Sequence, residues 1–338
     1  MKRRIGRRTA LSWLAGTTAA ASIPGLRRAR AQTLDRVSFL SNWRAQAEHG
    51  GYYQAVANGI YRRHGIDCDL RQGGPQINNS QILLNGRVDF TMGGGFQALS
   101  YARENLPALC IGAIFQKDPQ VLIAHPGVGN DSFEALRGKP ILISGGGRVS
   151  YWPFLRARFG YTDEQVRPYT FNMQPFLADR NAVQQGYITS EPFAIRQAGV
   201  NPVVLLIADA GYEPYSTTID ARKQMVDEKP DVVQRFVNAT IEGWYEYLNG
   251  DPAPGNALIK RDNPDMDDAK IAYAIRAMKE YGIVISGDAE RLGIGAMSDA
   301  RWERFFRQTV EYQLNPADLD FRKAYSLRFV NQRVGMRG

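Results

Sequence analysis

The loop from Ser41 to Ala55 combines residue types that bind planar ligands. Trp43 and Tyr52 offer flat faces for stacking, each with a polar atom at its edge, and His49 lies between them. The pair Gly50-Gly51 stands at the start of a predicted helix, where backbone N–H groups are open to a ligand. The loop therefore predicts one wall of a binding site. The alternative is that Trp43 only packs on its lobe's surface and His49 is only a polar residue at a helix end.

Two glycine triplets each follow a predicted strand and precede a predicted helix. They are Gly93-Gly94-Gly95 and Gly145-Gly146-Gly147, and Arg148 follows the second directly. Glycine lets a backbone approach a ligand closely, a helix start favours negative charge, and Arg148 adds a candidate contact for an anion. Neither triplet leads into the G-K-[ST] ending of a phosphate-binding loop or a G-x-G-x-x-G fingerprint, so tight turning is the alternative explanation.

A further candidate is Ser190-Glu191-Pro192, which follows a predicted strand. Proline suits the first position of a helix, so a helix begins here. Glu191 then either favours the helix dipole or faces a ligand, where its carboxylate would accept hydrogen bonds from an amino group.

Sets of catalytic residues are missing from the sequence. It contains no G-x-S-x-G elbow, no H-E-x-x-H and no carboxylate pair at a recognisable spacing. Two cysteines, Cys68 and Cys110, exclude a disulfide scaffold and a multi-cysteine zinc or iron–sulfur site, and three histidines leave little for a metal site. We expect a binding protein without metal or cofactor rather than an enzyme.

The elements that must position these loops alternate between strand and helix. In the first part we predict strands at Val37–Leu40, Ile66–Leu70, Val88–Met92 and Ala108–Phe115, and helices at Gly50–His64, Ser80–Asn85 and Phe96–Glu104. Short connections between such elements predict a parallel sheet with helices on both faces.

The alternation restarts after residue 117. We predict strands at Gln120–Ala124, Pro140–Ser144, Val166–Phe171, Tyr187–Thr189 and Val203–Ile207, and helices at Ser132–Leu136, Tyr151–Phe159, Phe176–Gln184 and Phe193–Ala198. From residue 222 the apolar residues recur at helical spacing in three stripes. Two α/β units and a helical C-terminal region predict two lobes with a cleft between them, with ligands at the carboxyl ends of the strands.

The charge of the chain is concentrated at its start. The 338 residues carry 42 Lys and Arg against 34 Asp and Glu, a formal charge of +8. Residues 1–31 hold eight basic residues and no acid, so the remainder is neutral. A neutral remainder argues against nucleic acid as a partner, and no apolar run after residue 31 is long enough to span a membrane.

Residues 1–31 have the order of an export signal. Arg7-Arg8 precede a weakly apolar run rich in Ala and Thr, and Ala29-Arg30-Ala31 offers an A-x-A cleavage site. We predict a twin-arginine-like signal peptide cleaved near Ala31, with a basic disordered tail as the alternative, and hence a periplasmic protein.

Four segments together resemble a known family. They are Asn42-Trp43 with His49-Gly50-Gly51-Tyr52-Tyr53, then Gly73-Gly74-Pro75, Leu84-Asn85-Gly86-Arg87-Val88-Asp89-Phe90 and Ser190-Glu191-Pro192. Between Val37 and Gly250 their order resembles the NMT1/THI5-like solute-binding proteins of ABC transporters.

The resemblance implies an α/β, type II periplasmic binding protein fold. A discontinuous first lobe (36–117 and 218–338) and a second lobe (118–217) would close around a small ligand and deliver it to a permease and ATPase complex. It implies a planar heteroaromatic ligand such as a thiamine-precursor pyrimidine, with riboflavin, sulfonates or nitrate bound by relatives.

The resemblance also implies site residues on both lobes. On the first lobe these are Asn42, Trp43, His49, Tyr52, Gly94, Phe96 and Gln116; on the second they are Gly146, Arg148, Tyr151, Trp152, Asn172 and Glu191. Trp43 and either Tyr151 or Trp152 would sandwich a planar ring, and Glu191 would pair with its polar edge.

Two alternatives stay open beside this one. An anion carrier, for a sulfonate or nitrate, would use the second glycine triplet and Arg148. An enzyme branch of the family makes the thiamine pyrimidine by consuming its own histidine and pyridoxal phosphate. That branch carries a cysteine-rich motif and a Gly-Glu-Phe-Gly loop. This sequence has two cysteines, Ser144-Gly145-Gly146-Gly147-Arg148 at the loop, and Ala45 where the branch has a lysine before its histidine.

The charge distribution gives a first testable prediction. The chain that starts at Gln32 should focus near neutral pH and leave duplex DNA unshifted in a gel at low salt, because its formal charge is zero. The chain with residues 1–31 attached is the control and should focus at basic pH. DNA binding by the shorter chain would contradict the assignment.

Overall fold

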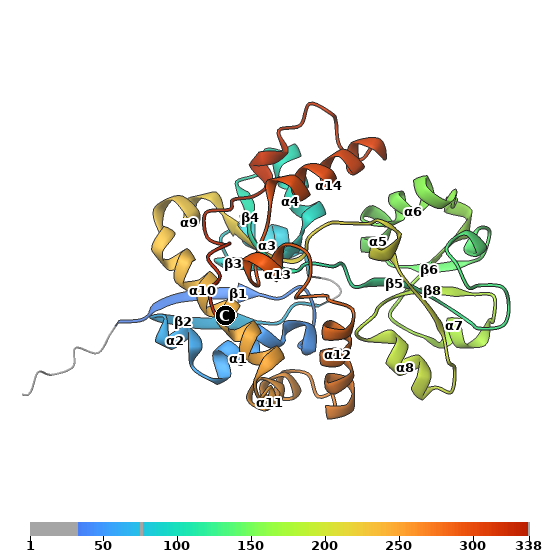
Figure 1. Ribbon diagram of the computed structural model, residues 1–338, viewed down its shortest axis with the longest axis horizontal. Helices are drawn as coiled ribbons and strands as arrows, with labels where there is room; N and C mark the ends of the chain where they lie inside the picture. The colour runs from blue at the N-terminus through green and yellow to red at the C-terminus, as the bar shows by residue number, and fades with distance from the viewer. Residues whose placement is uncertain (1–32, 75–76, 337–338) are drawn as a thin grey trace, which may run out of the picture. The chain divides into compact units, whose positions relative to one another are not determined.

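The computed structural model describes residues 33–74 and 77–336, and the predicted signal peptide lies outside these residues. From Leu34 onward the described chain forms one compact unit built on two five-stranded sheets (Figure 1). In the first, the order is β2 (Ile66–Arg71), β1 (Asp35–Leu40), β3 (Phe90–Gly94), β10 (Ser216–Arg222) and β4 (Ala108–Phe115).

The second sheet lies in the middle of the sequence. Its order is β7 (Val166–Pro168), β6 (Ile141–Ile143), β8 (Val183–Tyr187), β5 (Gln120–Ala124) and β9 (Val203–Leu206). The α/β class with two lobes is therefore as predicted.

Both sheets are mixed, so the prediction of parallel sheets is wrong. In the first sheet β10 runs antiparallel to both β3 and β4, and in the second β5 runs antiparallel to β8 and β9. The remaining pairs, such as β1 with β2 and β6 with β8, are parallel. The antiparallel strands are those that enter a sheet directly from the other one, without the helical crossover that a parallel neighbour requires.

The helices divide between the two sheets (Figure 1). With the first sheet are α1 (Gly50–Ala57), α2 (Ile60–Arg63), α3 (Asn79–Leu84), α4 (Gly95–Arg103), α9 (Lys223–Glu228), α10 (Pro230–Asn249), α11 (Ala253–Asp262), α12 (Asp268–Glu280), α13 (Asp288–Leu292) and α14 (Asp299–Glu311). With the second are α5 (Gly145–Val149), α6 (Trp152–Phe159), α7 (Gln174–Ala178) and α8 (Glu191–Gln197). Short 3₁₀ turns lie at Ala47–His49, Glu134–Leu136, Asp163–Gln165, Ile207–Ala210 and Phe321–Ala324.

Helix α10 packs on α1 through an apolar stripe, and this contact explains the glycine pair at the start of α1. A Cβ on Gly51 would lie 2.2 Å from Trp244 Cγ, and a Cβ on Gly50 would lie 2.0 Å from the Tyr247 ring. Only glycine allows the helices to approach this closely. The pair therefore serves helix packing, and neither glycine is among the residues that line the cavity described below.

Several helices and strands also begin or end at other residues than predicted. The predicted helix Gly50–His64 is broken at Gly59, whose φ of +64° lies in the left-handed region. The predicted helix Phe176–Gln184 ends at Ala178, and the strand expected at Tyr187–Thr189 is β8, which already begins at Val183. Strand β10 was not predicted.

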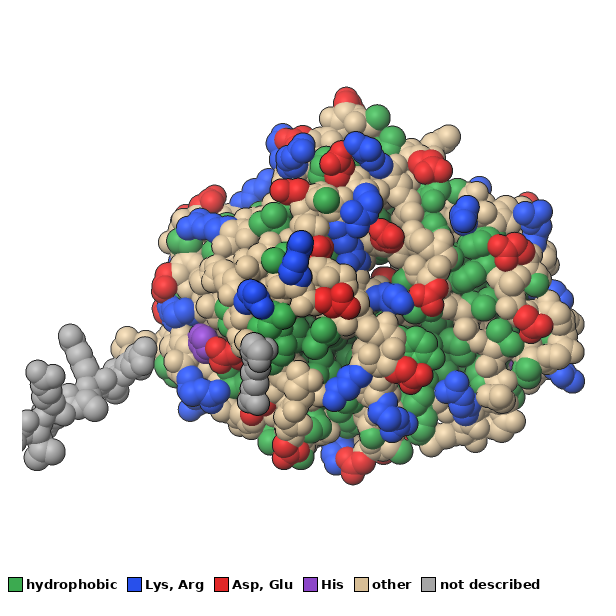
Figure 2. All heavy atoms as spheres, in the orientation of Figure 1, with side chains coloured by type: hydrophobic (Ala, Val, Ile, Leu, Met, Phe, Trp, Pro, Cys, Tyr) green, Lys and Arg blue, Asp and Glu red, His purple; other side chains and the backbone are tan. Residues whose placement is uncertain are grey.

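The face of the described chain that Figure 2 draws carries both signs of charge. Figure 2 shows Lys and Arg side chains interspersed with Asp and Glu over the visible face, with neither sign gathered into a patch. Within the described part of the chain, no helix has both the length and the apolarity needed to cross a bilayer.

Two segments pass between the sheets, and Arg301 on α14 holds both of them. Its Nη2 donates to the carbonyl of Gln116, between β4 and β5, and to that of Pro214 at 3.3 Å, just before β10. Its Nε donates to the carbonyl of Glu213 at 3.3 Å, and the guanidinium lies 4.3 Å from the centroid of the Tyr215 ring. A planar cation with several donors suits this task, because one group satisfies carbonyls from two segments.

Arg301→Ala should lower the free energy of unfolding by about 3 kcal/mol, because it leaves buried carbonyl groups without their charged donor. Urea denaturation of the chain from Gln32 measures this. Arg307→Ala is the matched control on the same helix: its pair with Glu303 is exposed and should contribute less than about 1 kcal/mol. Equal losses in the two variants would show that Arg301 is an ordinary surface residue.

Candidate functional site

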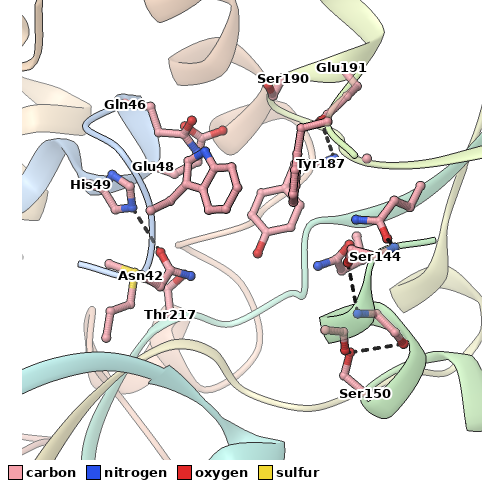
Figure 3. Close-up of a pocket in the computed structure, with 18 residues that line it drawn as sticks. Asn42, Gln46, Glu48, His49, Ser144, Ser150, Tyr187, Ser190, Glu191 and Thr217 are labelled. Carbon is pink, nitrogen blue, oxygen red and sulfur yellow. Dashed lines mark hydrogen bonds between the residues drawn. The ribbon is translucent and has the colours of Figure 1, made fainter. Parts of the chain in front are cut away.

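A cavity of about 230 Å³ lies between the two lobes, at the carboxyl ends of strands β1, β3, β6 and β8. This is the edge where open α/β sheets bind ligands. Its lining comes from both sheets (Figure 3) and consists of Asn42, Trp43, Gln46, Glu48, His49, Met92, Gln120, Ser144, Gly146, Gly147, Ser150, Phe171, Gln185, Gly186, Tyr187, Ser190, Glu191 and Thr217.

The loop after β1 forms the first wall. Ser41 Oγ donates to the carbonyl of Trp43 at 2.7 Å, and Gly73 N donates to the same carbonyl at 3.0 Å, so the Trp43 backbone is fixed. His49 Nε2 lies 3.2 Å from Asn42 Oδ1 and donates to it. Burial lowers the pKa of His49 to about 3, so the ring is neutral. His49 therefore positions Asn42 without adding charge.

Glu48 connects the two lobes at this wall. The Thr189 hydroxyl, just before α8, donates to Glu48 Oε1. Burial raises the pKa of Glu48 to about 7, and the nearby Glu191 carboxyl adds a smaller effect in the same direction. Near neutral pH this carboxyl is therefore partly protonated, which makes it both a donor and an acceptor.

The second glycine triplet forms part of the opposite wall, as the short helix α5. Ser144 caps it, with its Oγ accepting from Gly147 N at 3.2 Å, and Ser144 N donates to Gln185 Oε1 at 2.5 Å. A Cβ on Gly147 would lie 2.8 Å from Ile143 Cγ2, whereas a Cβ on Gly146 would meet only Ser144 Oγ, at 3.9 Å. Gly146 therefore leaves room for a ligand at the cavity wall.

Glu191 lies at the start of α8 and is held by two donors. Tyr187 N donates to its Oε2 at 2.8 Å and the Tyr169 hydroxyl to its Oε1 at 3.3 Å. Burial raises the pKa of Glu191. Gly186 must be glycine, because a Cβ there would lie 2.9 Å from Glu191 Cβ. These contacts fix a carboxyl group at the cavity (Figure 3).

The cavity contains acids and no cation. Of the lining residues, only Glu48 and Glu191 carry ionisable carboxyl groups, and none is Lys or Arg. Arg148 is exposed on α5 and is not part of the lining. An anionic ligand would meet the buried Glu48 carboxyl group and the half-buried Glu191 carboxyl group, with no compensating charge.

Aromatic side chains from both lobes meet at the cavity. The Trp43 and Phe171 rings lie 4.6 Å apart between centroids at 46°, and Tyr187 also lines the space. Phe171 has a φ of +62° and Thr217 a φ of +48°, a conformation that is costly for side chains of this kind. Thr217 sits at a register shift in β10, which turns its side chain into the cavity.

Five of the thirteen predicted site residues line the cavity: Asn42, Trp43, His49, Gly146 and Glu191. The other eight do not.

Four of these eight belong to the first lobe. Tyr52 is buried in the core, stacked on Phe39 at 4.2 Å. Gly94 ends β3, and Phe96 on α4 packs edge-on to Phe305 of α14 at 6.3 Å. Gln116 lies in the crossing segment, where its Nε2 donates to the carbonyl of Ala296 at 2.8 Å.

The other four belong to the second lobe. The glycine triplet itself forms α5, so Tyr151 and Trp152 begin the next helix and are buried behind it. Tyr151 donates to Gln185 Oε1 at 2.9 Å, and Trp152 Nε1 to Asp163 at 2.8 Å. Arg148 and Asn172 are exposed. Phe171, and neither Tyr151 nor Trp152, therefore faces Trp43.

The sequence also contains lining residues that were not predicted. Gln185 and Tyr187 lie two residues apart on β8, a spacing that places both on one face of a strand. They were missed because this stretch was divided between a helix and a later strand. Gln46 and Glu48 lie inside the aromatic loop, where only the rings and the glycine pair were considered.

Solved structures share this arrangement of two sheets and helices. The periplasmic aliphatic sulphonate-binding protein SsuA of Escherichia coli matches with a TM-score of 0.65 at 12% sequence identity, over 86% of this chain and 91% of SsuA. The fold is that of the periplasmic binding proteins of ABC importers, as the resemblance implied. The sequence model of the family described as "NMT1/THI5 like" matches residues 46–253, and the chain belongs to this family.

Two relatives differ in how much of the chain they match. The riboflavin-binding protein RibY of Chloroflexus aurantiacus is 27% identical over 331 residues, 95% of this chain and 94% of RibY. The 4-amino-5-hydroxymethyl-2-methylpyrimidine phosphate synthase of Aspergillus parasiticus is 27% identical over 109 residues, 32% of each chain. Of these two relatives, the one that matches over nearly the full length is thus a binding protein.

The Glu48 carboxyl predicts a pH dependence of stability. Its pKa is 4.5 in the reference state and about 7 in the fold, so between these values the folded chain holds a proton that the unfolded chain has lost. Stability should therefore fall as pH rises from about 5 to 8, and Glu48→Gln should remove roughly 3 kcal/mol of that fall.

Urea denaturation at the two pH values measures this difference. Burial also raises the pKa of Asp118 to about 6 and that of Asp220 to about 7, so both titrate in the same pH range. In Glu48→Gln the slope of stability against pH should therefore become smaller without disappearing. Glu213→Gln, at an exposed carboxyl, is the control and should keep the full slope. A Glu48→Gln variant with an unchanged slope would contradict the assignment.

Proposed function

We propose that this chain is the solute-binding component of an ABC importer that takes up an uncharged, planar nitrogen heterocycle of the pyrimidine or flavin class. The observation that carries the proposal is a cavity between two lobes that has aromatic rings at its walls, two carboxyl groups and no cationic side chain. Its partners would be the permease and the ATPase, and it would act in the periplasm after removal of residues 1–31.

The rings of Trp43 and Phe171 suit a flat ligand that lies against the pair and not between its two members. Trp43 and Phe171 are 4.6 Å apart, whereas a ring stacked between them would need roughly 7 Å, two contacts of about 3.5 Å each. This separation leaves no room for a ring between Trp43 and Phe171. The ligand would therefore lie against Trp43, and Phe171 would cover the ligand. Because the two rings come from different lobes, the ligand stabilises the closed state through contacts to both.

The polar groups suit a ligand edge rich in N–H donors. Glu191 accepts, and Gln120 Oε1 is buried with no hydrogen-bond partner among the described residues. A ring imide or an exocyclic amino group would satisfy these acceptors. Aminopyrimidines and the dione edge of a flavin both carry such groups.

The comparisons favour neither ring class alone. The thiamine-precursor pyrimidine is the ligand that the family resemblance implied, and riboflavin is the ligand in the name of RibY, the relative that matches over nearly the whole chain. A sulfonate or nitrate ligand is the alternative, but an anion would lack a cation in the lining. We propose binding rather than catalysis, because the match to the pyrimidine synthase covers a third of the chain.

A thermal-shift series on the chain from Gln32 tests this proposal. Riboflavin or 4-amino-5-hydroxymethyl-2-methylpyrimidine at a hundredfold excess over Kd should raise Tm by about 5 °C, because a ligand that binds only the folded state stabilises it by mass action. Ethanesulfonate and nitrate should leave Tm unchanged. A shift with the anions alone would overturn the proposal.

Glu191→Gln and Arg148→Ala separate the two ligand chemistries. Glu191→Gln should weaken binding of the heterocycle about tenfold in calorimetry, because an amide accepts a hydrogen bond less strongly than a carboxylate. Arg148→Ala should leave it unchanged, since Arg148 does not line the cavity. The reverse pattern would contradict the assigned role of Glu191.

A further inference from the structure

A second cavity of about 210 Å³ adjoins the first. It lies between α8 and α12 and shares three lining residues with the first cavity: Gln46, Glu48 and Ser190. The rest of its lining is Thr189, Phe193, Ala194, Asp265, Met266, Lys270, Tyr273 and Ala274. Neither volume alone reaches the roughly 300 Å³ at which pockets for drug-sized ligands begin, but the two together exceed it.

The wall between the cavities consists of polar side chains with hydrogen-bonding capacity to spare. Gln46 and Glu48 face Ser190 from the opposite lobe (Figure 3). Neither the Gln46 amide nor the Ser190 hydroxyl caps the helix it precedes. An amide, a hydroxyl and a carboxyl that is partly protonated can each both donate and accept, as alcohol groups do.

The second cavity has one cation in its lining, Lys270, and that cation is already paired. Lys270 Nζ donates to the carbonyl of Asp265 at 2.7 Å and lies 3.7 Å from Asp267 Oδ2. The Tyr273 hydroxyl donates to the carbonyl of Ile188 at 3.0 Å. Phe193, Ala194 and Met266 add apolar surface. The lining therefore fits an uncharged chain with a carbon backbone and hydroxyl groups.

We propose that the ligand carries an uncharged, hydroxylated tail that passes between Gln46 and Ser190 into the second cavity. This inference rests on the proposed function, because the ring must occupy the first cavity for the tail to reach the second. Of the two ring classes it favours those with a polyol or sugar substituent on a ring nitrogen, without phosphate.

Two ligand pairs that differ only in the tail test this on the chain from Gln32. They are lumiflavin against riboflavin, and cytosine against cytidine, with flavin mononucleotide as the phosphorylated form. In calorimetry the tailed member of the pair that binds should bind at least tenfold more tightly than the bare ring. Flavin mononucleotide should bind more weakly than riboflavin, because its phosphate would lie near Asp265, and the one cation in the lining, Lys270, is already paired with Asp267.

Ala194→Leu fills the second cavity from α8 and should reduce the affinity ratio of tailed to bare ring toward one. Ala198→Leu, at the exposed end of the same helix, is the control and should keep the wild-type ratio. Equal binding of tailed and bare rings, or an equal loss for both in Ala194→Leu, would overturn the tail site alone. If no ring of either pair binds, the proposed function itself fails, and the tail site with it.

Discussion

The arrangement of the two lobes depends on how the chain is held where it passes between the sheets. The guanidinium of Arg301 donates to carbonyls of both crossing segments and lies over the Tyr215 ring. The Tyr215 hydroxyl in turn accepts from Ser298 N, the residue that caps α14. Hydrogen bonds thus connect the start of α14, the Arg301 guanidinium and both crossing segments into a single group. Any rotation of the lobes must therefore take place beyond these residues, which keeps the strand ends that build the cavity opposite one another.

Within that frame, the cavity selects by charge and by shape. The carboxyl groups of Glu48 and Glu191, with no cation beside them, favour neutral ligands, and desolvation raises the pKa of each, so their own ionisation is disfavoured there. The Thr189–Glu48 hydrogen bond and the contact of Trp43 with Phe171 join the lobes without a ligand. A ligand therefore adds to contacts that already favour the closed state. It raises the population of that state by the amount by which it binds the closed state more tightly than the open one.

The sequence predicts best where local pattern and tertiary environment agree. β4 and β5 have the predicted limits because they are continuous apolar runs. Strand β10 was not predicted because its sequence contains Asp220 and three hydroxyl residues. These polar residues are buried in a central strand, where only the neighbouring strands stabilise them. The role of a glycine was also not predictable, because it depends on residues that are distant in sequence. Gly51 leaves room for the Trp244 side chain, whereas Gly146 lines the cavity. The five predicted residues that line the cavity follow strand ends, but so do Gly94, Gln116 and Asn172, which do not line it, because the direction of a loop side chain depends on tertiary packing that a sequence alone does not specify.

The position of β10 has a consequence for the order in which the chain folds. This strand completes the first sheet by inserting between β3 and β4, yet the whole second sheet is encoded between β4 and β10. During synthesis, the strands of the second sheet are all available before the first sheet can close. Until then β3 and β4 each expose an unpaired edge, the kind of edge at which chains aggregate. The lobe that begins the sequence is therefore the last to be finished.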